Sequence, residues 1–180
     1  HRKVGPRTID NLACHAELTP EPSNEAASLF DHRCQRSNMT VRVRRAFEFD
    51  GPPEAVWDFI STPAKRAGAI SVVDSYEVHG DGSATWHVRL PIPLVNSTVR
   101  VETEDVETDP PRHVKFVGKS STFRVTGEHT IESTETGCRL VNEFVVDGRV
   151  PGVERFFKRN LDDEMGNLER ALRKAVDPAA

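Results

Sequence analysis

The sequence predicts an α+β protein in which a curved antiparallel β-sheet wraps around one long C-terminal α-helix. Residues 72–146 read as consecutive short strands with no helix between them, and residues 153–176 show one long amphipathic pattern. Parallel neighbours need long crossover connections, so closely spaced strands favour antiparallel pairing. A helix with one apolar stripe must bury it, and the preceding strands are the obvious partner.

The first elements are a strand and two short helices. Alternating apolar residues predict a strand over residues 41–49, with Val41, Val43, Phe47 and Phe49 on one face. A turn follows at residues 50–54, where the prolines suit a first helical turn. The first helix then carries Val56, Trp57, Phe59 and Ile60. Pro63 ends it and starts a second short helix through Ala69.

Six further strands are expected, over residues 72–78, 84–90, 95–106, 113–118, 121–131 and 138–146. The glycine-rich turn at residues 79–82 joins the first two of them as a hairpin. Pro91 and Pro93 interrupt pairing in the apolar stretch 90–95, which we expect to rim a pocket mouth. Gly127 inside a strand predicts a bend or a close backbone approach.

The closing helix is well marked at both ends. Pro151 and Gly152 start it and Asp177 and Pro178 stop it. Its apolar side chains recur at helical spacing: Val153, Phe156, Phe157, Leu161, Met165, Leu168, Leu172 and Val176. Burying one large apolar side chain is worth about 1.5–3 kcal/mol, so the stripe anchors the helix strongly on the sheet.

Composition excludes several classes of function. The 180 residues carry a formal net charge of −4, which argues against a general affinity for nucleic acid. No apolar run reaches the length of a membrane span and no secretory leader is visible, so we expect a cytoplasmic protein without an integral membrane segment. Three cysteines, an odd number, argue against a disulfide framework.

Residues 1–38 show little periodicity and read as a disordered or non-native N-terminal extension. The expected domain is 39–177, with Met39 as its natural start. The extension holds Cys14, His15, His32 and Cys34, which are residue types that bind zinc. Structural zinc sites use ligand pairs two to four residues apart, a spacing that these residues lack, so no metal is expected.

The passage over residues 41–60, with its strand, Gly51-Pro52-Pro53-Glu54 turn and Val56-Trp57-Asp58-Phe59-Ile60 helix, resembles the START-like (SRPBCC, Bet v 1-like) superfamily. The likeness extends over residues 39–176 and is greatest to the group that joins polyketide cyclases/dehydrases with the G-type subunit of carbon monoxide dehydrogenase. It implies a helix-grip fold, in which seven antiparallel strands wrap the last helix and two short helices close one end. It also implies a deep, mostly apolar pocket and supplies no universal catalytic motif.

Strand and helix periodicity predicts which side chains would line that pocket. A curved sheet wider than its helix leaves a cavity between them, and such cavities commonly hold apolar ligands. The expected walls are Trp86, Val88, Phe116, Phe123, Val125 and Phe144 from the sheet and Phe157, Leu161 and Met165 from the helix. Because the strand assignments rest on parity, a one-residue bulge would exchange the two faces.

Two polar residues share the inward parity of these strands. His129 alternates with apolar neighbours and is either a structural histidine satisfied near a strand end or a ligand contact. Asn142 is a second candidate ligand contact, whereas Glu143 and His87 have the opposite parity and should lie outside. No nucleophile elbow, phosphate loop or dinucleotide motif is recognisable, so no cofactor is expected.

The expected function is binding of a hydrophobic small molecule, such as a lipid, quinone or polyketide-like compound, without catalysis. One alternative is an aromatase/cyclase-type enzyme in which His129 assists proton transfer on a folded polyketide. Another is an accessory or assembly factor for a carbon monoxide dehydrogenase-like metalloenzyme or respiratory complex, with an unidentified protein partner.

Overall fold

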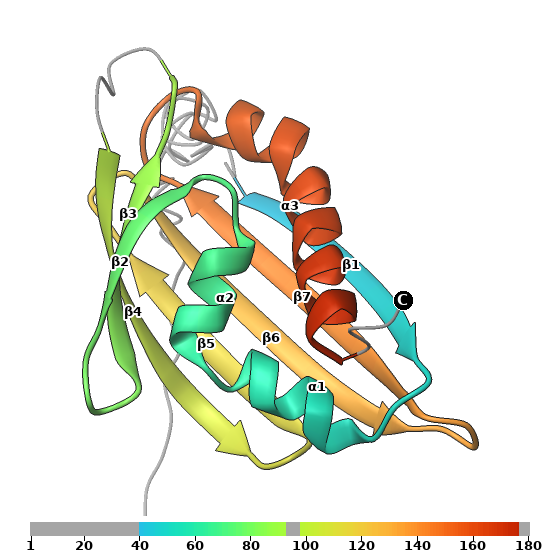
Figure 1. Ribbon diagram of the computed structural model, residues 1–180. Helices are drawn as coiled ribbons and strands as arrows, with labels where there is room; N and C mark the ends of the chain where they lie inside the picture. The colour runs from blue at the N-terminus through green and yellow to red at the C-terminus, as the bar shows by residue number, and fades with distance from the viewer. Residues whose placement is uncertain (1–39, 93–97, 177–180) are drawn as a thin grey trace, which may run out of the picture. The chain divides into compact units, whose positions relative to one another are not determined.

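The computed structural model describes residues 40–92 and 98–176, and within them it confirms the α+β helix-grip fold (Figure 1). The elements in order are β1 (Thr40–Phe49), α1 (Pro53–Ile60), α2 (Pro63–Ala69), β2 (Val73–Val78), β3 (Ser83–Arg89), β4 (Thr98–Asp109), β5 (His113–Lys119), β6 (Phe123–Ser133), β7 (Cys138–Gly148) and α3 (Val153–Val176). The strands form one sheet in the order β1-β7-β6-β5-β4-β3-β2, and every neighbouring pair is antiparallel. The predicted zinc-type residues and the N-terminal extension lie outside the described residues, as do 93–97 of the predicted pocket rim.

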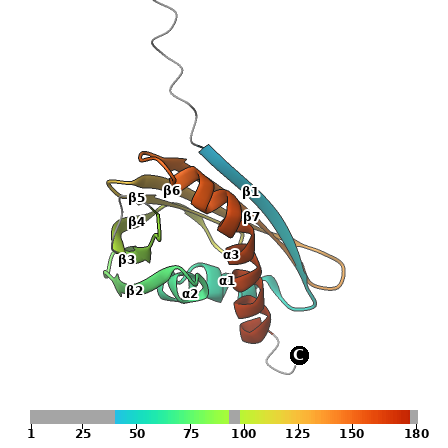
Figure 2. The same ribbon diagram turned by 90° about the horizontal axis from the view of Figure 1, so that it is seen from above.

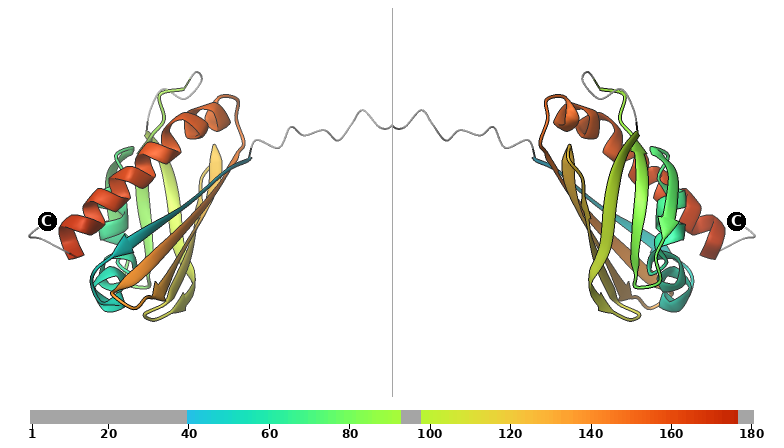
Figure 3. Two further views of the ribbon diagram at one scale, coloured as in Figure 1. Left: turned by 90° about the vertical axis from the view of Figure 1, so that its right-hand side faces the viewer. Right: turned by 90° about the vertical axis from the view of Figure 1, so that its left-hand side faces the viewer.

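The sheet curves strongly, and all three helices lie on its concave face (Figure 2). Helix α3 packs on β1, β7 and the two short helices, while α1 and α2 cover the other end of the sheet. Seen edge-on, α3 runs obliquely across the sheet, which leaves its middle turns over the central strands (Figure 3). This arrangement puts the candidate pocket residues between α3 and the sheet.

Helix α3 buries the predicted stripe, with one addition. Its buried residues are Val153, Phe157, Leu161, Glu164, Met165, Leu168 and Leu172, while Phe156 and Val176 are only half-buried. Gly152 has φ +92 directly before the helix, a conformation that favours glycine. No helix in the described part of the chain is both long and apolar enough to cross a membrane.

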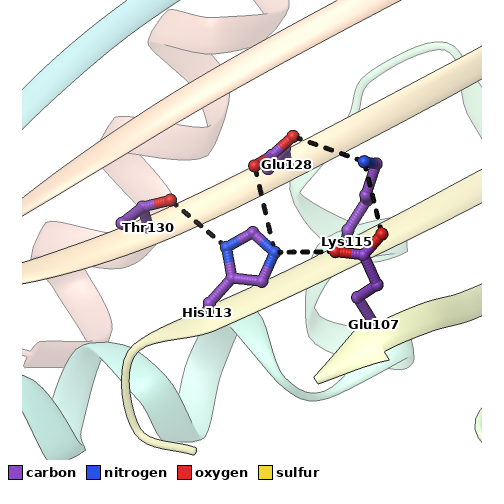
Figure 4. A network of polar contacts seen from close by, with 5 residues as sticks. All are labelled: Glu107, His113, Lys115, Glu128 and Thr130. Carbon is purple, nitrogen blue, oxygen red and sulfur yellow. Dashed lines mark hydrogen bonds and ion pairs between the residues drawn. The ribbon is translucent and has the colours of Figure 1, made fainter. Parts of the chain in front are cut away.

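The convex face of the sheet carries charged side chains. Glu107 on β4, His113 and Lys115 on β5, and Glu128 and Thr130 on β6 form a polar network (Figure 4). Its ion-pair distances run from 3.4 Å to 3.9 Å, and Glu107 is well exposed. Exposed pairs of this kind contribute at most about 1 kcal/mol each, so the network marks the solvent face of the sheet.

Candidate functional site

The candidate site is a cavity of about 60 Å³ between the concave face of the sheet and α3. Its walls come from β3 to β7, from α3, and from the connection between α2 and β2. The lining residues are Ile70, Val72, Val73, Trp86, Val88, Val101, Phe116, Phe123, Val125, Phe144, Val146, Phe157, Leu161, Glu164 and Met165.

Nine of the sequence-predicted residues meet at this cavity. They are Trp86, Val88, Phe116, Phe123, Val125 and Phe144 from the sheet and Phe157, Leu161 and Met165 from α3. No bulge intervenes within β6 or β7, so the parity of both strands holds from end to end. That these side chains contact a ligand remains a prediction.

Six further residues line the cavity. Val101 and Val146 follow the same alternation as their strand neighbours, and this parity could have identified them. Ile70, Val72 and Val73 come from a connection whose path depends on the tertiary fold, and all three are half-buried. Glu164 lies three residues after Leu161 and four before Leu168, so a carboxylate within the apolar stripe was the signal.

The Glu164 carboxylate ties the α2–β2 connection to the closing helix. Its oxygens accept hydrogen bonds from the Ser71 backbone N–H at 2.7 Å, the Ser71 hydroxyl at 2.5 Å and the Asn167 amide at 3.1 Å. Three donors compensate for the burial of the carboxylate, which is 6% exposed. The wall segment that contains Ile70 and Val72 is thereby held against α3.

The ring of Phe116 occupies the space over Gly127. A Cβ atom added at Gly127 would lie 2.2 Å from a ring carbon of Phe116, so only glycine leaves room for this packing. The ring centroid of Phe116 lies 5.9 Å from that of Trp86 and 5.9 Å from that of Phe144. The predicted close approach at Gly127 is therefore a side-chain approach that shapes the cavity wall.

Replacement of Gly127 by alanine is expected to lower the free energy of unfolding by about 1–3 kcal/mol, because Phe116 must move from its position. Urea unfolding followed by circular dichroism measures the change. Gly68→Ala is the matched control, since a Cβ there meets nothing within 4 Å and the site is helical. Equal stability of Gly127→Ala and the wild type would contradict this packing.

His129 and Asn142 lie beside the cavity but are not among its lining residues. Both are buried, and His129 Nδ1 lies 2.7 Å from the Asn142 side-chain oxygen. The Asn142 amide nitrogen donates to the Arg45 carbonyl at 3.5 Å, so its oxygen faces the imidazole and Nδ1 is the donor. In the described residues, His129 Nε2 has no hydrogen-bond partner.

Burial lowers the pKa of His129 to about 4, and the charge of Arg66 acts in the same direction. The imidazole is therefore neutral near pH 7. The Phe116 ring lies 6.0 Å from the imidazole and the Phe144 ring 5.6 Å from it, centroid to centroid. Both phenylalanines line the cavity, whereas the histidine does not.

Arg66 on α2 supports the end of the cavity near Phe116. Its guanidinium donates to the Ile60 carbonyl at 2.7 Å and pairs with Asp105 at 2.5 Å, and its central carbon lies 5.0 Å from the centre of the Phe116 ring. Burial lowers the pKa of Arg66 and raises that of Asp105, because it disfavours both charged forms. Sequence reasoning missed this pair, since the partners are far apart in the chain.

The predicted rim residue Ile92 is buried against Gly152 and lines a separate surface hollow with Phe156. Its role at a pocket mouth stays a prediction. Among residues 40–92 and 98–176, no group of three or more His, Cys, Asp or Glu side chains is arranged to hold a metal ion.

Comparison with known proteins gives a family match. Residues 40–173 match the family described as polyketide cyclase / dehydrase and lipid transport. A search of curated proteins found no match.

Three solved structures share the fold. A conserved protein from Geobacillus kaustophilus is 16% identical with a TM-score of 0.64, and the match covers 77% of this chain and 97% of that one. The Zhui aromatase/cyclase from Streptomyces sp. R1128 is 15% identical with a TM-score of 0.58, covering 78% and 99%. A START superfamily protein from Mycobacterium smegmatis is 12% identical with a TM-score of 0.60, covering 77% and 99%. At these identities the likeness concerns the fold.

Proposed function

The chain belongs to the polyketide cyclase / dehydrase and lipid transport family, and from that premise we propose that it binds a hydrophobic small molecule in the cavity without catalysing a reaction. The single observation that carries the proposal is the composition of the cavity wall. Fourteen of its fifteen lining side chains are aliphatic or aromatic, and the remaining one is the hydrogen-bonded Glu164. Such a surface favours an apolar body over a charged one.

The size of the cavity implies that the wall moves on binding. A volume of about 60 Å³ accommodates only small groups, whereas pockets for drug-sized ligands measure about 300–1,000 Å³. The half-buried segment with Ile70, Val72 and Val73 runs into β2, which is an edge strand of the sheet. We place the movable wall there, because an edge strand has one neighbour fewer to hold it.

The positions of the polar groups support binding rather than catalysis. A general acid or base must reach the reacting group, and its pKa should lie near the working pH. His129 stands outside the lining, and its pKa of about 4 keeps it unprotonated near neutral pH. Glu164 faces the cavity, but its carboxylate already accepts three hydrogen bonds. The aromatase/cyclase alternative therefore lacks a poised proton-transfer group among the described residues.

Filling the cavity should abolish binding. The full chain is expected to bind the neutral fluorescent probe 1-aminoanthracene in a saturable one-to-one complex. Val125→Phe places a ring in the cavity and should weaken this binding at least about tenfold, which corresponds to about 1.4 kcal/mol. A fluorescence titration measures both dissociation constants.

Val106→Phe is the matched control for this experiment. It makes the same change on β4 at a residue that is 45% exposed and outside the lining. Its dissociation constant should equal that of the wild type. If Val125→Phe and Val106→Phe bind the probe alike, the proposed site is wrong.

A further inference from the structure

We propose that the cavity selects a neutral hydrophobic ligand that carries a carbonyl oxygen, and that the indole N–H of Trp86 donates a hydrogen bond to this oxygen. The inference rests on the proposed binding function and narrows the class of ligand.

Trp86 provides the first observation. It lies on β3, lines the cavity and is 7% exposed. Its Nε1 is buried and has no hydrogen-bond partner in the described residues. A buried tryptophan N–H normally finds an acceptor, and leaving it without one costs free energy. The other unpartnered nitrogens near Phe116, His129 Nε2 and Arg66 Nε, belong to residues outside the lining.

Water is a poor acceptor for this N–H. A buried water needs two to four polar partners, and a purely apolar surface does not provide them. Apart from Trp86, Glu164 is the one lining residue with a polar side chain, and Ser71 and Asn167 already occupy its oxygens. A ligand can carry its own acceptor on an apolar body that fits the rest of the wall.

The charge of Glu164 decides between a carbonyl and a carboxylate. A ligand carboxylate would face the Glu164 carboxylate across a small cavity with apolar walls, where like charges repel strongly. A ketone, ester or quinone carbonyl accepts from the indole N–H without adding a charge. It also brings no donor of its own that would need an acceptor.

Two matched probes test the hydrogen bond. Acetophenone and α-methylstyrene have nearly the same shape, but the second has a carbon–carbon double bond in place of the carbonyl. The chain has two tryptophans, so the ¹⁵N-labelled full chain gives two indole signals in an NMR spectrum. Trp57→Phe identifies the signal of Trp86, because Trp57 lies outside the cavity lining.

Acetophenone should shift the Trp86 indole proton downfield on binding, whereas α-methylstyrene should not. The ratio of the two dissociation constants should change by about three- to tenfold in Trp86→Phe, in the direction that disfavours acetophenone, and should stay unchanged in Trp57→Phe. Benzoate should bind at least about tenfold more weakly than acetophenone. The downfield shift in the wild type does not depend on how well either variant folds.

Three results would overturn the inference, and they are distinguishable. An unchanged ratio in Trp86→Phe, with no downfield shift in the wild type, removes the hydrogen bond and leaves the binding function intact. Benzoate that binds as tightly as acetophenone removes the selection for a neutral ligand. If none of the probes nor 1-aminoanthracene binds, the proposed function falls and the inference falls with it.

Discussion

Replacement of Arg66 by methionine is expected to lower the free energy of unfolding by about 3–5 kcal/mol, the usual cost of breaking a buried ion pair. Arg66 is 4% exposed and holds both Asp105 and the Ile60 carbonyl. Methionine keeps an unbranched apolar stem but leaves the Asp105 carboxylate without its partner in a partly buried position. Urea unfolding at pH 7 measures the change.

Lys65 is the matched control for Arg66. It is the preceding residue of the same helix and pairs with Asp58, but both side chains are exposed. Lys65→Met should therefore cost at most about 1 kcal/mol. A second change, Asp105→Leu, should restore much of the stability that Arg66→Met loses, because it removes the unpaired charge. Equal losses in Arg66→Met and Lys65→Met would contradict this account of the pair.

Acidification from pH 7.5 to pH 5.0 is expected to cost the protein about 2 kcal/mol through His129 alone. The folded-state pKa of His129 is about 4, below its ordinary value of 6.5, so the unfolded chain binds a proton more readily. The stability contribution of the neutral imidazole is complete above pH 6.5. It is lost as the pH falls from 6.5 towards 4.

A comparison with His129→Asn isolates this contribution. Asparagine offers an N–H near the position of Nδ1, which donates to Asn142, but it does not titrate. Urea unfolding at both pH values gives the loss for each protein, and the carboxylates that titrate in both cancel in the difference. The wild type should lose about 2 kcal/mol more than the variant. Equal losses would mean that the folded imidazole binds its proton normally.

Periodicity predicted the fold because each element repeats its own signal over many residues. The closing helix has eight apolar positions at helical spacing, and the structure places α3 at the predicted residues Val153–Val176. Alternation likewise predicted the inward faces of β6 and β7, where the register is unbroken. Nine predicted residues line the cavity for this reason.

The polar framework of the site could not be predicted in the same way. The Arg66–Asp105 pair joins α2 to β4, and Asp105 lies beside a register shift between Asp105 and Glu107 that no local pattern announces. The bond from Ser71 to Glu164 spans 93 residues. Such contacts depend on where separate elements come to lie, whereas periodicity reports only which face of each element is apolar.

Native mass spectrometry of the freshly purified full chain, alone and with excess 1-aminoanthracene, tests the central claim most directly. We predict that the wild type carries one hydrophobic small molecule, either retained from the cell or added as the probe, and that Val125→Phe carries none. The mass of the bare chain alone for both proteins under both conditions would contradict the account.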